Sequence, residues 1–399
     1  MLKMLLKNNY SKTLISKIII VGVSFLDTVL INRTLSVELR GEYGVVINLI
    51  TILNLIFSLN IGASYQLFFK KQENFKRMFI SFIVLQFLLL SIISFVITFI
   101  FQSQYIFCLL MITSIFIFRD NITAINLVEN INKRNIIFLC TTVGYTIVLL
   151  IVYLLQLSSY ELLLYILGGR YFLETIISFG IYHYKSDIRL NLKFFIDNKE
   201  KIQTILSNSL AISIIAVLTT CNYNIDVIML KAFDINNFDI GLYSVASTLV
   251  NMTWIIPDAF KEVLIHKLSR YDAKKEVKRS ILLNIIISII IIVGFFILGK
   301  WFIVLLYGEN YSGAYNLTLI LLIGSIPMIL YKLINPYLLS INKKKNILFY
   351  LTIAVCCNLI SNYFVIPVYG AYGAAISSVI SYSICGFLFM LGFMKKEKR

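Results

Sequence analysis

Charged side chains interrupt several long apolar stretches of the sequence, and their chemistry needs an explanation. Arg170 is the clearest example, and Glu174 follows it by one helical turn on the same helix face. A charge in the middle of a lipid bilayer costs ~2.5–3.5 kcal/mol on insertion scales. Two interpretations stay open. The two residues form a self-neutralising pair that serves packing, or Arg170 faces a polar cavity, binds an anionic group there, and is held by Glu174 when that group is absent.

Cations occur in two further apolar stretches. Lys332 lies between Pro327 and Pro336, and it either faces the same cavity or extends its ammonium group toward the helix end. Arg119 and Asp120 are adjacent, so a helix places them on different faces. They either frame an entrance to the cavity or form a structural ion pair. The predicted anion-binding cations are therefore Arg170, Lys332 and Arg119.

Acidic residues in the apolar stretches are predicted to act in coupling or gating. Asp27 and Asp226 occupy matching places in an internal repeat of the chain. They either hold helices together or exchange a proton or a cation. Asp258 and Lys261 follow Pro257 at helical spacing, and we expect them to form a gate network beside a helix kink. Glu174 completes this predicted set.

The composition places most of the chain in lipid. Of its 399 residues, 59% are apolar and 14% are charged, and the mean hydropathy is +0.86. Lipid leaves unpaired backbone groups unsatisfied, and about 20 apolar residues cross its hydrocarbon layer as a helix, so we expect an all-α membrane protein. The six cysteines lie in apolar stretches without CxxC spacing, so neither a metal site, a disulfide nor a cofactor is expected. We predict about twelve transmembrane helices, at residues 14–32, 43–67, 78–101, 105–127, 136–155, 161–183, 203–230, 241–265, 280–299, 313–340, 346–366 and 371–394.

Lysine and arginine residues determine the expected orientation. Most of the 36 lie at the termini and in every second connection, whereas the connections on the other side hold Arg33, Arg40, Lys231 and Lys300. Positive residues favour the cytoplasmic side of a membrane, so both termini are expected there. The net charge of +16 therefore matches the headgroups of membrane lipids, and we expect no nucleic-acid partner.

The chain repeats itself once. Residues 25–50, which contain Asp27 and Gly41, match residues 222–250, which contain Asp226 and Gly241. We therefore expect two pseudo-symmetric six-helix lobes, residues 1–184 and 203–399, joined by a cytoplasmic linker at 185–202. An even number of spans in each half inserts both halves in the same orientation, so the substrate site is expected between them.

Three motifs carry a family resemblance: GLYSVA at 241–246, LYGENYSGA at 306–314 and IPVYGAYGAA at 366–375. With them the whole chain resembles the polysaccharide (O-antigen repeat-unit) flippases of the multidrug/oligosaccharidyl-lipid/polysaccharide exporter superfamily. The resemblance implies two lobes around a cationic cavity in the bacterial inner membrane. It also implies alternating-access transfer of undecaprenyl-diphosphate-linked oligosaccharide from the cytoplasmic to the periplasmic leaflet. A glycan polymerase and a chain-length regulator are the implied protein partners.

Other functions remain as alternatives. A lipid II or small-molecule exporter of the same superfamily fits the same motifs. An integral-membrane glycan polymerase or transferase is the alternative from another class. Such a polymerase carries catalytic groups in a large outer loop, whereas the outer connections here are short. Because His183 and His266 both lie at helix ends among lysines, neither fits a catalytic histidine within the membrane. We therefore expect no enzyme activity and no catalytic residues.

Overall fold

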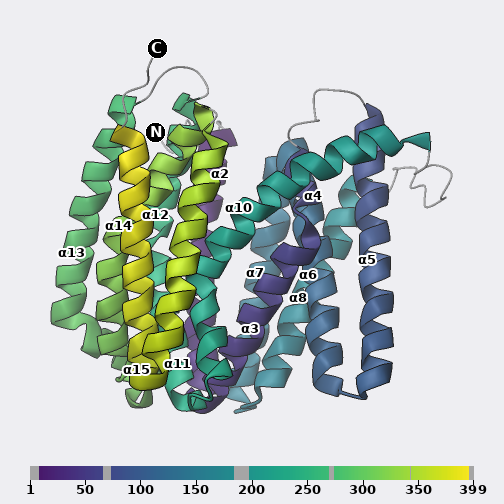
Figure 1. Cartoon of the computed structure of the whole chain (residues 1–399). Helices are drawn as coiled ribbons and strands as arrows, with labels where there is room; N and C mark the ends of the chain where they lie inside the picture. The colour runs from purple at the N-terminus through teal and green to yellow at the C-terminus, as the bar shows by residue number, and fades with distance from the viewer. Residues whose placement is uncertain (1–8, 66–72, 184–196, 269–273, 342, 395–399) are drawn as a thin grey trace. The chain divides into compact units, whose positions relative to one another are not determined.

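The computed structural model describes residues 9–65, 73–183, 197–268, 274–341 and 343–394, which are helical almost throughout (Figure 1). Ten stretches of these residues are long and apolar enough to span a membrane, and α15 merges two helices across a kink. The expectation of an all-helical membrane protein is confirmed, whereas the arrangement in two six-helix lobes stays a prediction. The helices are α2 (Asn9–Thr34), α3 (Val37–Ser58), α4 (Ile61–Ser64), α5 (Glu73–Phe101), α6 (Gln104–Glu129), α7 (Ile131–Leu154), α8 (Tyr160–His183), α10 (Lys199–Ala232), α11 (Asn237–Thr253), α12 (Ile255–Leu268), α13 (Lys274–Tyr307), the 3-10 turn η2 (Glu309–Tyr311), α14 (Ala314–Ser340) and α15 (Lys344–Met394).

Proline and glycine determine where two of these helices are interrupted. Pro257 lies in the first turn of α12, where a missing N–H is tolerated, and α11 ends just before it at Thr253. Within α15, Pro367 precedes Gly370, whose φ of 54° is a conformation that glycine adopts without strain. The predicted interruption at Pro257 is therefore present, and it separates Asp258 from the preceding helix.

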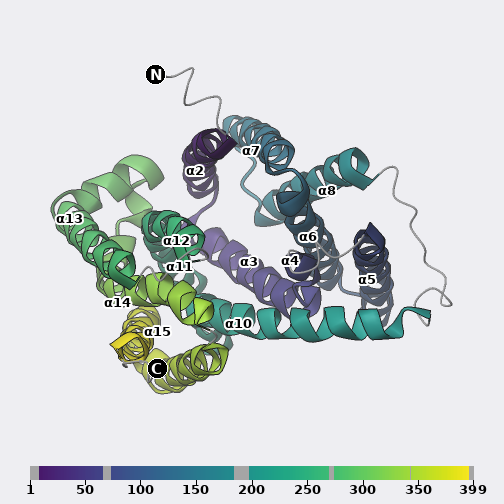
Figure 2. The same ribbon diagram turned by 90° about the horizontal axis from the view of Figure 1, so that it is seen from above.

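The first compact unit contains residues 1–35 and 49–216. Its central helix is α6, which contacts α4, α5, α7 and α8, while α2 packs along α7 (Figure 2). An apolar core that includes Phe79, Ile83 and Ile122 joins α5 to α6. This packing fixes α6, α7 and α8 beside one another, and these are the helices that carry the predicted arginines.

The second compact unit contains residues 36–48 and 217–399. Its central helix is α14, which contacts α11, α12, α13 and α15 (Figure 1). Two helices, α3 and α10, belong to both units, because the division falls after Asn48 in α3 and after Ala216 in α10. The lobe boundaries at 184 and 203 remain a prediction, and most of the linker predicted at 185–202 lies outside the described residues.

Candidate functional site

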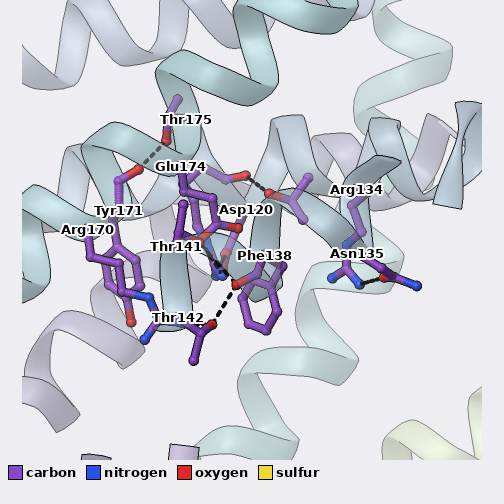
Figure 3. Close-up of polar contacts among 12 residues, drawn as sticks. Asp120, Arg134, Asn135, Phe138, Thr141, Thr142, Arg170, Tyr171, Glu174 and Thr175 are labelled. Atoms are coloured by element: carbon purple, nitrogen blue, oxygen red, sulfur yellow. Dashed lines mark hydrogen bonds and ion pairs between the residues drawn. The ribbon is translucent and has the colours of Figure 1, made fainter. Parts of the chain in front are cut away.

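Three arginines from three helices gather around Phe138 in the first unit. Their guanidinium carbons lie 5.3 Å (Arg119, α6), 5.6 Å (Arg134, α7) and 5.5 Å (Arg170, α8) from the centre of its ring. Figure 3 shows Phe138 between Arg170 and Arg134. The face of an aromatic ring attracts cations through its quadrupole, which offsets part of the repulsion among the three charges. We call Arg119, Arg134, Arg170 and Phe138 the arginine cluster.

Two acids neutralise Arg119 of this cluster. Its Nη1 donates to Asp120 Oδ1 at 2.8 Å and its Nη2 donates to Glu174 Oε2 at 3.2 Å. Asn54 donates to the second Asp120 oxygen at 2.9 Å. The structure shows the ion pair between Arg119 and Asp120, and their place at an entrance stays a prediction. The expected pairing of Glu174 with Arg170 is wrong, because Arg119 reaches the buried Glu174 carboxylate from the neighbouring helix.

Arg170 has hydroxyl and aromatic neighbours. Its Nη2 donates to Thr142 Oγ1 at 2.7 Å, and its guanidinium carbon lies 5.0 Å from the ring centre of Tyr145. Within the described part of the chain Arg170 forms no ion pair, and its buried Nε has no hydrogen-bond partner. A guanidinium group with open donors can form the paired hydrogen bonds that phosphate oxygens accept.

Arg134 is a member of the cluster that sequence analysis missed. It follows Lys133 near the start of α7, so it fits the pattern of a cytoplasmic connection. In the structure its Nη1 donates to Asn135 Oδ1 at 3.1 Å. The signal that could have indicated it is the spacing of Arg134, Phe138 and Thr142 at intervals of four residues, which places them on one face of α7.

The same face of α7 binds Asp27 of α2. Thr146 Oγ1 donates to Asp27 Oδ1, and the aspartate is only 5% exposed. Arg170 lies close enough to act on Asp27 electrostatically. A buried carboxylate is costly unless a cation and hydrogen-bond donors compensate it. Here Thr146 supplies a donor and Arg170 supplies positive charge, so Asp27 and Arg170 form one electrostatic system across α2, α7 and α8.

Asp226 is the corresponding aspartate of the second unit, and it is fully buried. Its carboxylate accepts hydrogen bonds from Tyr243 Oη at 2.8 Å, from Asn362 Nδ2 at 2.6 Å and from Ser378 Oγ. Asn362 also donates to Asn358 Oδ1 at 3.0 Å. None of the ion pairs among the described residues includes Asp226. Neutral side chains from α11 and α15 therefore hydrogen-bond to the buried carboxylate of α10.

Lys332 is bound to an acid. Its Nζ donates to both oxygens of Asp258, at 2.9 and 2.8 Å. The ammonium group also lies 5.1 Å from the ring centre of Trp254 and 5.9 Å from that of Tyr223. Lys261 acts on Lys332 electrostatically from the same helix as Asp258. The structure thus brings Lys332, Asp258 and Lys261 together, with the lysine charge neutralised by Asp258, whereas Asp226 belongs to the separate network described above.

The described residues contain no cluster of three or more His, Cys, Asp or Glu side chains suited to a metal ion. The charged clusters of the described residues instead combine one or two acids with cations and neutral oxygens. Such groups can bind an anionic substrate group through Arg170, or a proton or monovalent cation through Asp226.

Solved structures of membrane transporters share this fold. A structure described as the lipid II flippase MurJ in an inward closed conformation matches with a TM-score of 0.71 and 18% identity, over 96% of this chain and 87% of that one. An inward-facing multidrug resistance MATE family transporter of the MOP superfamily matches with a TM-score of 0.71 and 13% identity, over 92% and 93%. An outward-facing MATE family transporter matches with a TM-score of 0.59 and 14% identity, over 96% and 93%.

No protein-family model and no curated protein sequence matches the chain. At such low identities the structural similarity establishes the fold and leaves the substrate undetermined. The chain therefore has the fold seen in these MurJ and MATE transporter structures, which correspond to it over nearly its whole length.

Proposed function

We propose that the protein is a flippase for polyprenyl-diphosphate-linked oligosaccharides, specifically undecaprenyl-linked repeat units of a bacterial surface polysaccharide. The fold supports a transporter, and the cation cluster supports an anionic substrate group. A lipid-linked diphosphate has such a group at the junction between sugars and lipid. The polyprenyl chain remains in the bilayer, where exposed apolar side chains such as Ile290, Phe296 and Ile297 of α13 suit it.

The observation that carries this proposal is that Arg170 forms no direct ion pair among the described residues and acts on Asp27 only electrostatically. Arg119 is neutralised by Asp120 and Glu174, and Lys332 is neutralised by Asp258. Arg170 donates to the hydroxyl of Thr142, and its buried Nε has no hydrogen-bond partner among the residues that the structure describes. An anionic group gains most from the cation that no protein carboxylate already satisfies. We therefore assign Arg170 to the substrate diphosphate, with Arg134 and Phe138 at its side.

Transfer proceeds by alternating access and is coupled to a cation at Asp226. The substrate enters from the cytoplasmic leaflet, the units move, and the sugars leave on the other side. Asp226 is a buried carboxylate next to Asn358, Asn362 and Ser378. Hard monovalent cations bind to such combinations of carboxylate, amide and hydroxyl oxygens, and a proton binds to the carboxylate alone. Binding of either one neutralises the buried charge and so links the conformation of the protein to the gradient of that ion, which supplies the energy.

The first experiment measures binding with a substrate panel. The purified protein in lipid nanodiscs is heated with undecaprenyl-diphosphate oligosaccharide, lipid II, undecaprenol-linked sugar without phosphate, or a cationic dye. A ligand that binds only the folded protein raises its melting temperature. We expect stabilisation by the diphosphate oligosaccharide in the wild type and in Lys133→Ala, an exposed neighbour of the cluster, and its loss in Arg170→Ala.

The panel also decides between the alternatives. Stabilisation by lipid II alone would assign the chain to lipid II transport, which is the activity named for the MurJ structure of the same fold. Stabilisation by the cationic dye alone would indicate a small-molecule exporter. Equal stabilisation of wild type and Arg170→Ala by the diphosphate lipid would remove Arg170 from the site. Bacterial localisation and cytoplasmic termini belong to the same proposal, and thiol labelling of single cysteines from each side of the membrane tests the orientation.

A further inference from the structure

A cavity lies in the second unit between the first and the last turns of α15. Its volume is about 420 Å³, and it is lined by Tyr350, Leu388, Leu391 and Met394. Ligand cavities typically measure about 300–1,000 Å³, so this one has room for one chain of a lipid. Met394 is 68% exposed, which leaves the cavity open on one side. We call these four residues the α15 groove.

A glycine shapes the α15 groove. A Cβ atom added to Gly392 would lie 2.9 Å from Cε2 of Tyr350 and 3.1 Å from its hydroxyl, so only glycine leaves this ring its place. The Tyr350 ring also packs edge-on against Phe389, with 5.5 Å between the ring centres. These contacts join the start of α15 to its end, and both ends of the helix lie at the same end of the second unit (Figure 1).

Positive charge is concentrated beside the α15 groove. Three consecutive exposed lysines stand at the start of α15, namely Lys343, Lys344 and Lys345. Lys343 precedes Tyr350 by seven residues, which is two helical turns, so the two residues lie on the same side of the helix about 10 Å apart along its axis. An apolar cavity with cations about two turns away fits a ligand that has an apolar chain and an anionic head.

We propose that the α15 groove and the three lysines bind one phospholipid with an anionic headgroup. One acyl chain lies in the groove, the Tyr350 hydroxyl donates a hydrogen bond to an oxygen of the lipid, and the lysines attract the headgroup phosphate. By the charge pattern of the connections this lipid belongs to the cytoplasmic leaflet. The bound lipid stabilises the contact between the two ends of α15. This inference does not depend on which substrate the protein transports.

A second group of exposed cations in the same unit distinguishes a specific site from general attraction to anionic lipid. Three of these cations lie in the first turns of α13, namely Lys275, Lys278 and Arg279. The residues that line the groove all belong to α15. General attraction of a charged surface depends on both groups of cations, whereas a lipid bound in the groove depends on the lysines of α15.

Lipid titration tests the charged part of the site. The purified protein in uncharged detergent receives phosphatidylglycerol or phosphatidylcholine with the same acyl chains, and native mass spectrometry counts the bound lipids. We expect phosphatidylglycerol to bind at least about tenfold more tightly. Replacing the three α15 lysines by glutamine should remove this preference, whereas the same replacement of the three α13 cations should retain it. Equal binding of the two lipids, or equal losses in both variants, would overturn the site.

Photolabelling tests the groove itself. Phosphatidylglycerol with a photoactivatable group in one acyl chain should label the peptide that contains Leu388 and Leu391. Leu391→Trp fills the groove and should reduce this labelling several-fold, whereas Leu282→Trp, on the exposed face of α13, should leave it unchanged. Labelling spread evenly over α5, α13 and α15 would contradict the proposal. So would loss of labelling on addition of undecaprenyl-diphosphate oligosaccharide, because the groove would then hold the chain of that lipid.

Discussion

Asp27 and Asp226 occupy equivalent places in the internal repeat, yet their surroundings differ. Asp27 lies beside Arg170 and receives a hydrogen bond from Thr146. Asp226 is surrounded by Tyr243, Asn362 and Ser378, all of them neutral. In the first unit Arg170 therefore supplies positive charge to Asp27, whereas in the second unit the described residues compensate Asp226 with hydrogen bonds and no ion pair.

This difference indicates a division of labour between the units. In the first unit the arginine near Asp27 has open donors, so an anionic substrate can draw positive charge away from the aspartate. In the second unit the aspartate lacks a protein cation among the described residues, so an external proton or cation can neutralise it. We propose that the repeated scaffold serves substrate binding in one half and coupling in the other.

The largest expected effect comes from Asp226→Asn. The amide is close in size to the carboxylate but cannot take up a proton or hold a cation, so coupled transport should fall by about 100-fold while the protein remains in the membrane. Uptake of lipid-linked oligosaccharide into proteoliposomes is measured with imposed sodium and proton gradients. Asp234→Asn, an exposed change beyond the end of the same helix, is the control. Full gradient dependence in Asp226→Asn would remove the coupling role.

Removing the cation of the first unit should leave Asp27 without its charge partner. Arg170→Ala is expected to lower stability by about 3 kcal/mol, the cost typical of an uncompensated buried charge. Adding Asp27→Asn should restore most of that stability but no substrate binding. Denaturant unfolding of the single and double variants gives the coupling energy. Additive effects of the two changes would show that Asp27 and Arg170 do not act as one system.

The Lys332–Asp258 pair should behave as a structural pair. Asp258 has a side chain that is 45% exposed, so Lys332→Met alone is expected to cost about 1 kcal/mol of stability. The double variant Lys332→Met with Asp258→Asn should regain that stability and retain transport within about threefold of wild type. Loss of transport in the stable double variant would instead place Lys332 in the substrate site.

The smallest expected effect comes from Phe138→Leu. The change keeps apolar volume but removes the ring that faces three guanidinium groups. A cation–π contact contributes about 0.5–1 kcal/mol at partly exposed sites, so affinity for the diphosphate lipid should fall about threefold. Phe116→Leu is the matched control, because its ring faces Arg119 alone of the cluster. If both variants lost the same affinity, the contact of the Phe138 ring with three guanidinium groups would not contribute specifically to substrate binding.

Much of the fold follows from sequence pattern. Apolar length predicts the spanning helices, Pro257 predicts the interruption before α12, and the repeat predicts the equivalence of Asp27 and Asp226. These features depend on the length of apolar stretches, on the chemistry of single residues and on the internal repeat, all of which can be recognised in one sequence. Gly41 and Gly241, which lie 200 residues apart, also belong to the repeat. Only the three-dimensional structure shows that they lie next to each other.

Partner choice among buried charges could not be predicted from sequence. Glu174 follows Arg170 by one turn, yet it binds Arg119 from α6, because packing of α6 against α8 brings that pair closer. Lys332 pairs with Asp258 across the contact of α14 with α12. Helical spacing identifies same-face neighbours on one helix, whereas ion pairs between helices depend on register and rotamers.

The central claim, that Arg170 receives the substrate diphosphate, is tested most directly by translocation in proteoliposomes. Wild type, Arg170→Ala, Arg170→Lys and Lys133→Ala are reconstituted with a fluorescent undecaprenyl-diphosphate oligosaccharide, and its arrival in the opposite leaflet is followed by quenching. We predict transfer by wild type and Lys133→Ala, reduced transfer by Arg170→Lys, which keeps the charge without the paired donors, and none by Arg170→Ala. Wild-type transfer by correctly inserted Arg170→Ala would contradict the account.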